Sequence, residues 1–157
     1  MKLKVLAALI AVVPMIVVPG ALSAQADDQV HSDAAMVAEA VRMNQMLIDL
    51  YNARKFEEMA ARYYAEDAIA LPPNHEPVRG PAAIAEYFRG VRDSLGEAEY
   101  NQQPLRSSVS GDNVSLMSEY SGHQGQLRVL GHETFERQPD GSLRAVQDMF
   151  GFRDPLR

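Results

Sequence analysis

The spacing of hydrophobic residues divides the chain into two parts. Up to Gly96, apolar residues recur every three or four positions, which is typical of amphipathic helices. After Gly96, apolar and polar residues alternate in short runs separated by turn residues, which indicates strands. The chain is therefore predicted to form helices first and a strand meander second.

Three helices are expected in the first part. The first starts at Ser32 or Asp33, either of which can cap a helix, and ends near Asn52. The third begins at Pro81, whose missing N–H costs nothing at the first helical position. The predicted helices span residues 33–52, 56–67 and 81–96.

Five strands are expected, the first of them between the second and third helices. Residues 68–71 form an apolar run of strand length, and Pro72-Pro73 forces an extended exit from it. Pro104 marks a bulge or an edge in the next strand. Helices segregated from an antiparallel sheet make an α+β fold. We expect a cone-shaped α+β barrel, with three N-terminal helices packed on a strongly curved antiparallel sheet. The four later strands are predicted over residues 98–109, 114–120, 126–137 and 143–152.

The N-terminus has the features of a secretory signal peptide. Lys2 and Lys4 precede an apolar segment, residues 5–18, that is shorter than the roughly 20 residues of a membrane span. Small residues follow, with Ala24-Gln25-Ala26 as one cleavage pattern and residues 22–24 as a rival. An uncleaved N-terminal anchor is the alternative. Cleavage predicts a periplasmic or secreted protein with no membrane partner.

The rest of the chain is one domain by length. We assign residues 1–26 to the signal peptide, residues 27–35 to a flexible polar lead-in, and residues 36–157 to the folded domain. The sequence has no cysteine, so an exported domain has no disulfide and depends on its core, with or without a dimer interface.

The charge balance and the motifs exclude several functions. Without Lys2 and Lys4, 13 basic residues face 21 acidic ones, and the net charge of −8 argues against nucleic acid and anionic membranes as partners. The four histidines show no metal-ligand spacing. There is no Gly-rich phosphate loop, nucleophile elbow or cysteine nucleophile. We therefore predict no metal and no cofactor.

The element order and several short motifs resemble the nuclear transport factor 2-like superfamily, within it the SnoaL-like and ketosteroid-isomerase-like proteins. This fold hosts isomerases, dehydratases, cyclases, epoxide hydrolases and proteins without catalysis, so the resemblance implies a fold and a pocket but no substrate. It covers about residues 36–152, and the residues that carry it are Asn52-Ala53, 64–68 (YAEDA), 71–74 (LPPN), 80–84 (GPAAI), Asp140-Gly141 and 147–151 (QDMFG).

The resemblance argues against steroid isomerisation by the known mechanism. It puts Leu47 where ketosteroid isomerases hold the oxyanion with a tyrosine, and Pro72 where they have the aspartate base. Their second oxyanion donor, a protonated aspartate, corresponds to Glu133. Two of the three roles are lost, and one survives as a longer carboxylic acid.

The resemblance also implies a pocket with two carboxyl groups. The family's cavity-facing aromatic residues match Phe135 and Phe150, and strand parity puts Glu133 and Asp148 on the same faces. Burial and mutual repulsion raise the pKa of such carboxyl groups, so one can stay protonated while the other acts as a base. The predicted pocket residues are Leu47, Tyr64, Leu71, Phe88, Phe135 and Phe150.

Each chemical candidate has a structural alternative. In the alternative to the catalytic interpretation, Asp148 forms a pair with Arg144, Arg128 or a backbone N–H. Glu133 then lies in water at the rim of the cavity. His75, in the proline-rich loop near the predicted cavity mouth, is either a general base or a solvated surface residue.

Two functions follow from these residues. The first is an exported small-molecule-binding protein that uses Glu133, Asp148 and His75 for isomerisation, dehydration or hydrolysis of a small apolar ligand. The second is a non-catalytic dimeric module whose cone is filled by its own side chains. In both, we expect a homodimer through the outer sheet face, which mixes polar and apolar residues as dimer interfaces often do. That face carries Arg128, Leu130, His132, Thr134 and Glu136.

Overall fold

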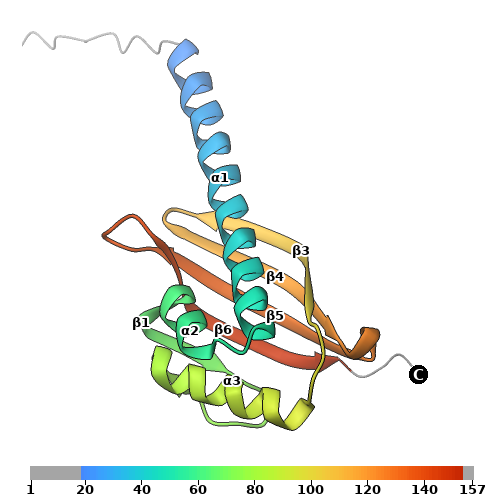
Figure 1. Ribbon diagram of the computed structural model, residues 1–157. Coiled ribbons are helices and arrows are strands. Elements are labelled where there is room, and N and C mark those ends of the chain that lie inside the picture. The colour runs from blue at the N-terminus through green and yellow to red at the C-terminus, as the bar shows by residue number, and fades with distance from the viewer. Residues whose placement is uncertain (1–18, 154–157) are drawn as a thin grey trace, which may run out of the picture.

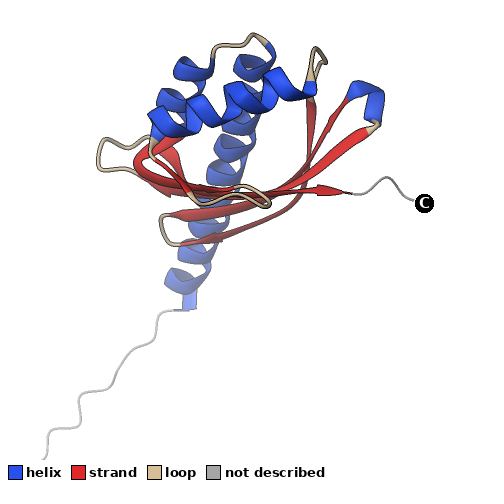
Figure 2. Cartoon of the chain, turned by 90° about the horizontal axis from the view of Figure 1, so that it is seen from below, coloured by secondary structure: helices blue, strands red, loops and turns tan. Residues whose placement is uncertain are grey.

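The structure, a computed structural model, describes residues 19–153, with side chains from residue 32 onward. Within these residues, three helices cover one face of a six-stranded sheet (Figure 1, Figure 2). The helices are α1 (Pro19–Asn52), α2 (Phe56–Tyr63) and α3 (Pro81–Leu95). The strands are β1 (Tyr64–Leu71), β2 (Val78–Arg79), β3 (Asn101–Ser110), β4 (Asn113–Gly122), β5 (Leu127–Arg137) and β6 (Leu143–Arg153), with a 3-10 turn at His123–Gly125.

The sheet has the order β2-β1-β6-β5-β4-β3. Strands β3 to β6 form the expected antiparallel meander, and Pro104 lies at a register shift in the edge strand β3. The α+β class with three helices on the sheet is confirmed. Two details differ: β1 runs parallel to β6, and the sheet, extended by the short strand β2, is mixed and open. Alternating apolar residues identify a strand but not the direction of its neighbour, so the sequence pattern left this undetermined.

Helix α1 is longer than the sequence pattern predicts. It begins at Pro19 and not at Ser32 or Asp33, and residues 27–35, which we assigned to a polar lead-in, lie within it. The N-terminal part of α1 projects beyond the sheet (Figure 1). A helix surrounded by solvent needs no apolar stripe. The loss of apolar spacing therefore marks where α1 leaves the core, not where it begins.

The predicted signal peptide cannot be compared with the structure over most of its length. Residues 1–18 lie outside the described residues, so its cleavage stays a prediction. Among residues 19–153, no helix is long and apolar enough to cross a membrane.

The boundary between α2 and β1 lies earlier than expected. Helix α2 ends at Tyr63, and the strand starts at Tyr64 instead of Ala68, because Tyr64 already adopts an extended backbone and lies opposite Ala145 of β6. Tyr63 and Tyr64 are both buried, one on the helix and one on the strand. The segment predicted as the last helical turn is thus part of the sheet.

A register shift in β6 positions the inward-facing carboxylate. Thr134 lies opposite Gln147 and Phe135 opposite Ala145, so Val146 has no partner on β5. Leu143 and Ala145 are buried before this bulge, whereas Asp148 is the buried residue after it. The bulge therefore changes which positions of β6 face the helices.

Candidate functional site

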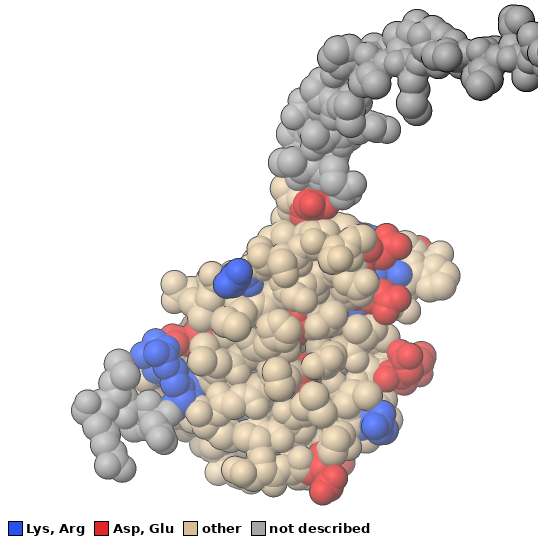
Figure 3. Space-filling model, turned by 180° about the vertical axis from the view of Figure 1, so that it is seen from behind, with Lys and Arg blue, Asp and Glu red and all other residues tan. Residues whose placement is uncertain are grey.

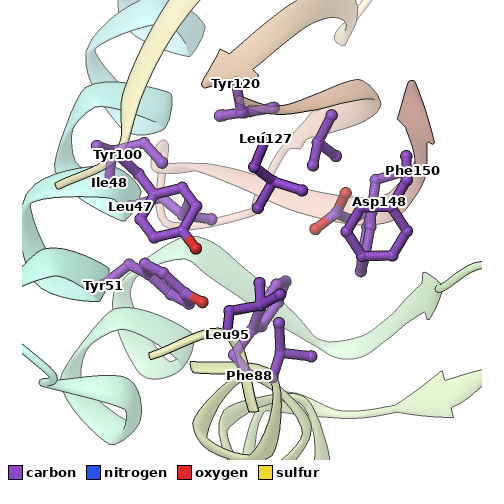
Figure 4. Close-up of a pocket in the computed structure, with 13 residues that line it drawn as sticks. Leu47, Ile48, Tyr51, Phe88, Leu95, Tyr100, Tyr120, Leu127, Asp148 and Phe150 are labelled. Carbon is purple, nitrogen blue, oxygen red and sulfur yellow. The ribbon is translucent and has the colours of Figure 1, made fainter. Parts of the chain in front are cut away.

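A half-enclosed pocket of about 90 Å³ lies between α1, α3 and the inward side of β4, β5 and β6 (Figure 4). Its wall is apolar apart from tyrosine hydroxyls and a single carboxylate, that of Asp148. Among the described residues, no cluster of three His, Asp or Glu side chains is arranged to hold a metal ion. The aromatic residues that line the pocket are Tyr51, Phe88, Tyr100, Tyr120, Phe150 and Phe152.

Asp148 presents one carboxylate oxygen to this pocket. Its Oδ2 accepts a hydrogen bond of 2.5 Å from the Tyr64 hydroxyl, and no described residue donates a hydrogen bond to its Oδ1. Only 5% of Asp148 is exposed. Burial raises the pKa of Asp148 from its ordinary 3.8 to about 6, and the hydrogen bond from Tyr64 opposes this rise. At neutral pH the group is therefore ionised, but it binds a proton more readily than a surface aspartate.

Glu133 lies directly opposite Asp148 in the β5–β6 register, but it does not line the pocket. It is 1% exposed, and its Oε1 accepts a 2.6 Å hydrogen bond from the Tyr120 hydroxyl. Burial raises the pKa of Glu133 to about 8, the charge of Asp148 adds to the rise, and hydrogen bonds from Tyr120 and Asn44 oppose it. Glu133 is therefore protonated at neutral pH beside an ionised Asp148.

A buried polar network behind the pocket is centred on Asn44 of α1. Its Nδ2 lies 2.8 Å from the Tyr120 hydroxyl, 3.2 Å from Ser118 Oγ and 3.4 Å from Glu133 Oε2. Its Oδ1 accepts a hydrogen bond from the Tyr63 hydroxyl. The network ties α1 and α2 to β4 and β5, and its low-dielectric surroundings strengthen each bond.

The alternative that pairs Asp148 with an arginine and places Glu133 in water is wrong for Arg144, Arg128 and Glu133. Arg144 donates hydrogen bonds to the backbone oxygens of α2, and Arg128 pairs with Glu119. Neither arginine contacts Asp148, and Glu133 is buried instead of lying in water at the cavity rim.

The predicted pocket residues separate into three groups. Leu47, Phe88 and Phe150 line the pocket together with Asp148. Tyr64 lies behind the wall and reaches the pocket only through its hydrogen bond to Asp148. The third group, Leu71 and Phe135, does not line the pocket.

Phe135 and Leu71 are not pocket residues. Phe135 is fully buried against the ring of Tyr63, with the ring centres 5.4 Å apart. Phe135 is two residues further along β5 than Glu133, and at this position the strand packs against Tyr63 of α2 instead of facing the pocket. On β1, Ala68 and Ala70 are the buried residues, so Leu71 belongs to the opposite side of the sheet.

His75 is exposed in the loop after β1 and does not line the pocket. Its ring lies 5.1 Å from that of Tyr87, and its Nδ1 lies 2.7 Å from the backbone oxygen of Glu76. It lines a separate surface groove of about 630 Å³ beside α3. His75 was predicted to lie near the mouth of the cavity. It lies in the groove next to the pocket, and the two spaces share Val91, Leu95 and Phe152.

Sequence reasoning missed Asn44, Tyr51, Tyr100 and Tyr120. Asn44 counted as part of the polar face of α1, although its three- and four-residue spacing from Ala40, Leu47 and Ile48 places it within the apolar stripe. Tyr120 was recognisable as an inward residue of β4 because it follows Leu116 and Ser118 at a spacing of two residues and therefore lies on the same face. Tyr100 was assigned to the predicted strand over residues 98–109, but it lies just before β3, and alternation along that strand did not show that it reaches the pocket.

The helices, the sheet order and the pocket together define the cone-like class of nuclear transport factor 2-like folds. Two solved structures illustrate the likeness. One is a nuclear transport factor 2-like protein with a cystatin-like fold from Novosphingobium aromaticivorans (TM-score 0.62, 18% identity, covering 90% of this chain and 94% of that one). The other is a ketosteroid isomerase-like protein from Erwinia carotovora atroseptica (TM-score 0.61, 12% identity, covering 75% and 96%). At these identities the likeness concerns the fold alone.

Within that class, the SnoaL-like domain family matches residues 44–154. The chain therefore belongs to the SnoaL-like domain family, as the resemblance implied. ActVI-ORFA from Streptomyces coelicolor has a similar structure (TM-score 0.60, 14% identity, covering 75% of this chain and 97% of that one). No curated protein sequence matches the chain.

Proposed function

We propose that this SnoaL-like protein is an exported enzyme that binds a small, mostly apolar molecule and moves a proton on it with Asp148. The observation that carries the proposal is the free Oδ1 of Asp148 in an otherwise apolar pocket. An ionised carboxylate with a raised pKa is suited to accept a proton near neutral pH and to give it back.

Glu133 acts in this proposal as a positioning residue. Its protonated carboxyl group lies beside Asp148 and is held by Tyr120 and Asn44. When Asp148 accepts a proton, its charge no longer adds to the raised pKa of Glu133, but burial still favours the protonated form, so the pair holds between one and two protons through the cycle. The charge of Asp148 thus raises the pKa of Glu133 further while Asp148 is ionised.

The single carboxylate favours isomerisation over the two other expected reactions. Among the described residues, only Asp148 brings a carboxyl group into the pocket. One group can take a proton from one atom of the ligand and return it to another, so the ligand changes its bonding and nothing is consumed. Hydrolysis and dehydration usually divide the acid and base roles between two groups.

The size of the pocket supports a small reacting group. Ligand pockets for drug-sized molecules are roughly 300–1,000 Å³, whereas this one is about 90 Å³. Larger ligands would extend past Val91, Leu95 and Phe152 into the neighbouring groove. Phe152, 53% exposed, lies where the two spaces meet.

A fragment experiment tests the proposal. A library of small apolar molecules is screened by protein NMR, and the bound molecules are then incubated in D2O to measure deuterium incorporation. We expect exchange that Asp148→Asn abolishes and that Asp140→Asn, a surface-turn control, leaves unchanged. Equal exchange in the wild type and Asp148→Asn would refute the role of Asp148. If no fragment binds, the non-catalytic module becomes the better description.

The homodimer through the outer sheet face is a second proposal, compatible with either function. Met117, His132 and Met149 lie side by side across β4, β5 and β6, and Leu130 is next to them on β5. Met117, Leu130 and Met149 are 39%, 36% and 45% exposed. Seen from behind, charged side chains lie mainly around the rim of this face (Figure 3). An apolar centre within a charged rim is the usual anatomy of an interface.

A further inference from the structure

Three side chains that can ligate a soft metal ion lie in one row across the outer face of the sheet. In the strands that the structure describes, methionine occurs only as Met117 of β4 and Met149 of β6, and histidine only as His132 of β5. Met117 lies opposite His132, and His132 lies opposite Met149. The register of the strands therefore places one imidazole directly between two thioethers.

The row lies on the side of the sheet that the helices leave uncovered. Met117 and Met149 are 39% and 45% exposed, and the residue before each of them on its strand is buried. Directly opposite residues of neighbouring strands have Cβ atoms roughly 4.5–5.5 Å apart. A methionine sulfur is two bonds beyond Cβ on a flexible, unbranched chain. Both sulfurs can therefore reach an ion that is bound to the ring of His132.

One ring nitrogen of His132 is buried without a hydrogen-bond partner. His132 Nδ1 is inaccessible to water, although His132 belongs to the outer face, and no described residue hydrogen-bonds to it. A buried polar atom without a partner costs free energy and is uncommon in folded proteins. Imidazole nitrogen is a common metal ligand. The nitrogen that lacks a partner thus points to a ligand independently of the row itself.

The side chains around the row supply no free carboxylate. The carboxylate of Glu119, in the next row of the same face, forms ion pairs with Arg128 and Arg153. Thioether and imidazole ligands suit Cu(I), whereas carboxylate oxygens suit Mg²⁺, Ca²⁺ and Mn²⁺. The ligand set therefore indicates Cu(I). The row on the other side holds Ser115, Thr134 and Gln147.

The charge at the end of the row also favours a monovalent ion. Arg106 of β3 lies opposite Met117, and the apolar Leu71 of β1 lies opposite Met149 at the other end. The repulsion between a cation and a positive side chain is proportional to the charge of the cation. A divalent ion is therefore repelled more strongly by Arg106 than Cu(I), so charge and ligand chemistry indicate the same ion.

We propose that Met117, His132 and Met149 form a binding site for Cu(I), with one ion per chain, on the outer face of the sheet. The site is separate from the pocket of Asp148, which lies on the inward side, and it does not rest on the proposed function. Spacing along the chain did not reveal it, because its ligands come from three strands and are neighbours only through the register. The sequence contains no cysteine, so thioethers are its only sulfur ligands.

An Ag(I) titration tests the site, because Ag(I) has the charge and the ligand preference of Cu(I) and needs no reductant. Binding is followed by NMR of protein labelled with 13C-methyl methionine, and native mass spectrometry counts the bound ions. We expect the methyl signals of Met117 and Met149 to shift together and to saturate at one ion per chain. Zn(II) at the same concentration should shift neither signal.

Single replacements identify the ligands. Met117→Leu, Met149→Leu and His132→Gln should each weaken Ag(I) binding by more than about tenfold, since even changes to the partners of metal ligands typically cost 10- to 100-fold in affinity. The control Met46→Leu changes a half-buried methionine of α1, and the control His75→Gln changes an exposed histidine. Both controls should bind Ag(I) as the wild type does.

The leucine variants also separate metal binding from the proposed dimer. Leucine keeps the apolar area of the outer face, so weaker Ag(I) binding at an unchanged mass in light scattering reports the loss of a ligand. Equal binding in all variants would place Ag(I) elsewhere and overturn the inference. One ion per two chains would also overturn it, because the ligands would then come from two copies. Zn(II) binding as tight as that of Ag(I), or failure of Cu(I) to displace Ag(I) under argon, would overturn the assignment to Cu(I).

Discussion

Replacing Glu133 with glutamine tests whether the buried carboxyl group is protonated in the folded protein. A carboxyl group whose pKa is higher in the folded state stabilises the fold at low pH, and this stabilisation is lost as the pH rises through the folded-state pKa. For Glu133 the pKa rises from 4.5 to about 8. Between pH 5 and pH 8 this shift corresponds to a loss of about 3 to 4 kcal/mol in the free energy of unfolding.

Asp148 changes the total but not the comparison. Its smaller shift, from 3.8 to about 6, adds a loss of about 1 kcal/mol over the same pH range. Glu133→Gln removes only the larger contribution, because glutamine is neutral at every pH and has nearly the shape of the protonated acid. The variant should therefore match the wild type within about 1 kcal/mol at pH 5 and be more stable by several kcal/mol at pH 8.

Urea unfolding followed by circular dichroism at pH 5, 6, 7 and 8 measures this difference. Glu136→Gln is the matched control, since Glu136 lies on the same strand but is exposed, and its curve should run parallel to the wild type. Surface carboxylates with lowered pKa values titrate below this range and cancel in the comparison. If Glu133→Gln also runs parallel to the wild type, Glu133 is ionised at neutral pH and the proposed proton distribution is wrong.

Three further predictions concern the buried network, the outer sheet face and the N-terminus. Asn44→Ala leaves several buried hydroxyls without partners and should lower the free energy of unfolding by about 2 to 4 kcal/mol, whereas the exposed neighbour change Gln45→Ala should cost under about 0.5 kcal/mol in urea unfolding. Met149→Lys should shift the protein from dimer to monomer in light scattering, while Ala82→Lys on α3 should not; a wild-type monomer would contradict the dimer. N-terminal sequencing of exported protein should begin at Gln25 or Asp27, and a start at Met1 would contradict cleavage.

The sequence predicted the fold well because its strongest signals are local. Pro81 and Gly80 mark the start of α3, Pro104 marks the irregular edge strand, and alternation locates β4 to β6 within a few residues. Strand direction is different, because it depends on which segments meet after folding. The parallel pairing of β1 with β6 joins residues that lie more than 70 positions apart, and nothing in either segment specifies it.

The site was predictable only where it follows strand parity. Asp148 and Phe150 face the pocket because alternation resumes after the bulge at Val146, and Glu133 lies opposite Asp148 as its position on β5 implies. Parity identifies a face but not a depth along the strand. It therefore grouped Phe135 with the pocket, although that end of the cone is filled by Tyr63 and its neighbours.

The partial filling of the cone connects the two expected functions. Side chains from α1 and α2 fill the closed end of the cone, so only a small pocket remains. The hydrogen-bond network of Asn44 and Tyr120 in this filled part surrounds Glu133 and excludes it from water. A fully open cone would hydrate Glu133 and leave its pKa near the ordinary value. The filled half is thus what gives Asp148 an uncharged neighbour at neutral pH.

Two glycines show how the site depends on positions without side chains. A Cβ at Gly131 would lie 2.3 Å from Glu133 Oε1 and 2.6 Å from the Tyr120 ring, and a Cβ at Gly122 would meet the Tyr100 ring. Glycine inside a strand weakens it, so its presence there often marks a close approach by another group. Both glycines lie on the inward side of the sheet, and each makes room for a polar side chain of the site. Gly131, inside β5, therefore marks the close approach of Glu133 and Tyr120, although a glycine in the sequence does not say which side chain approaches it.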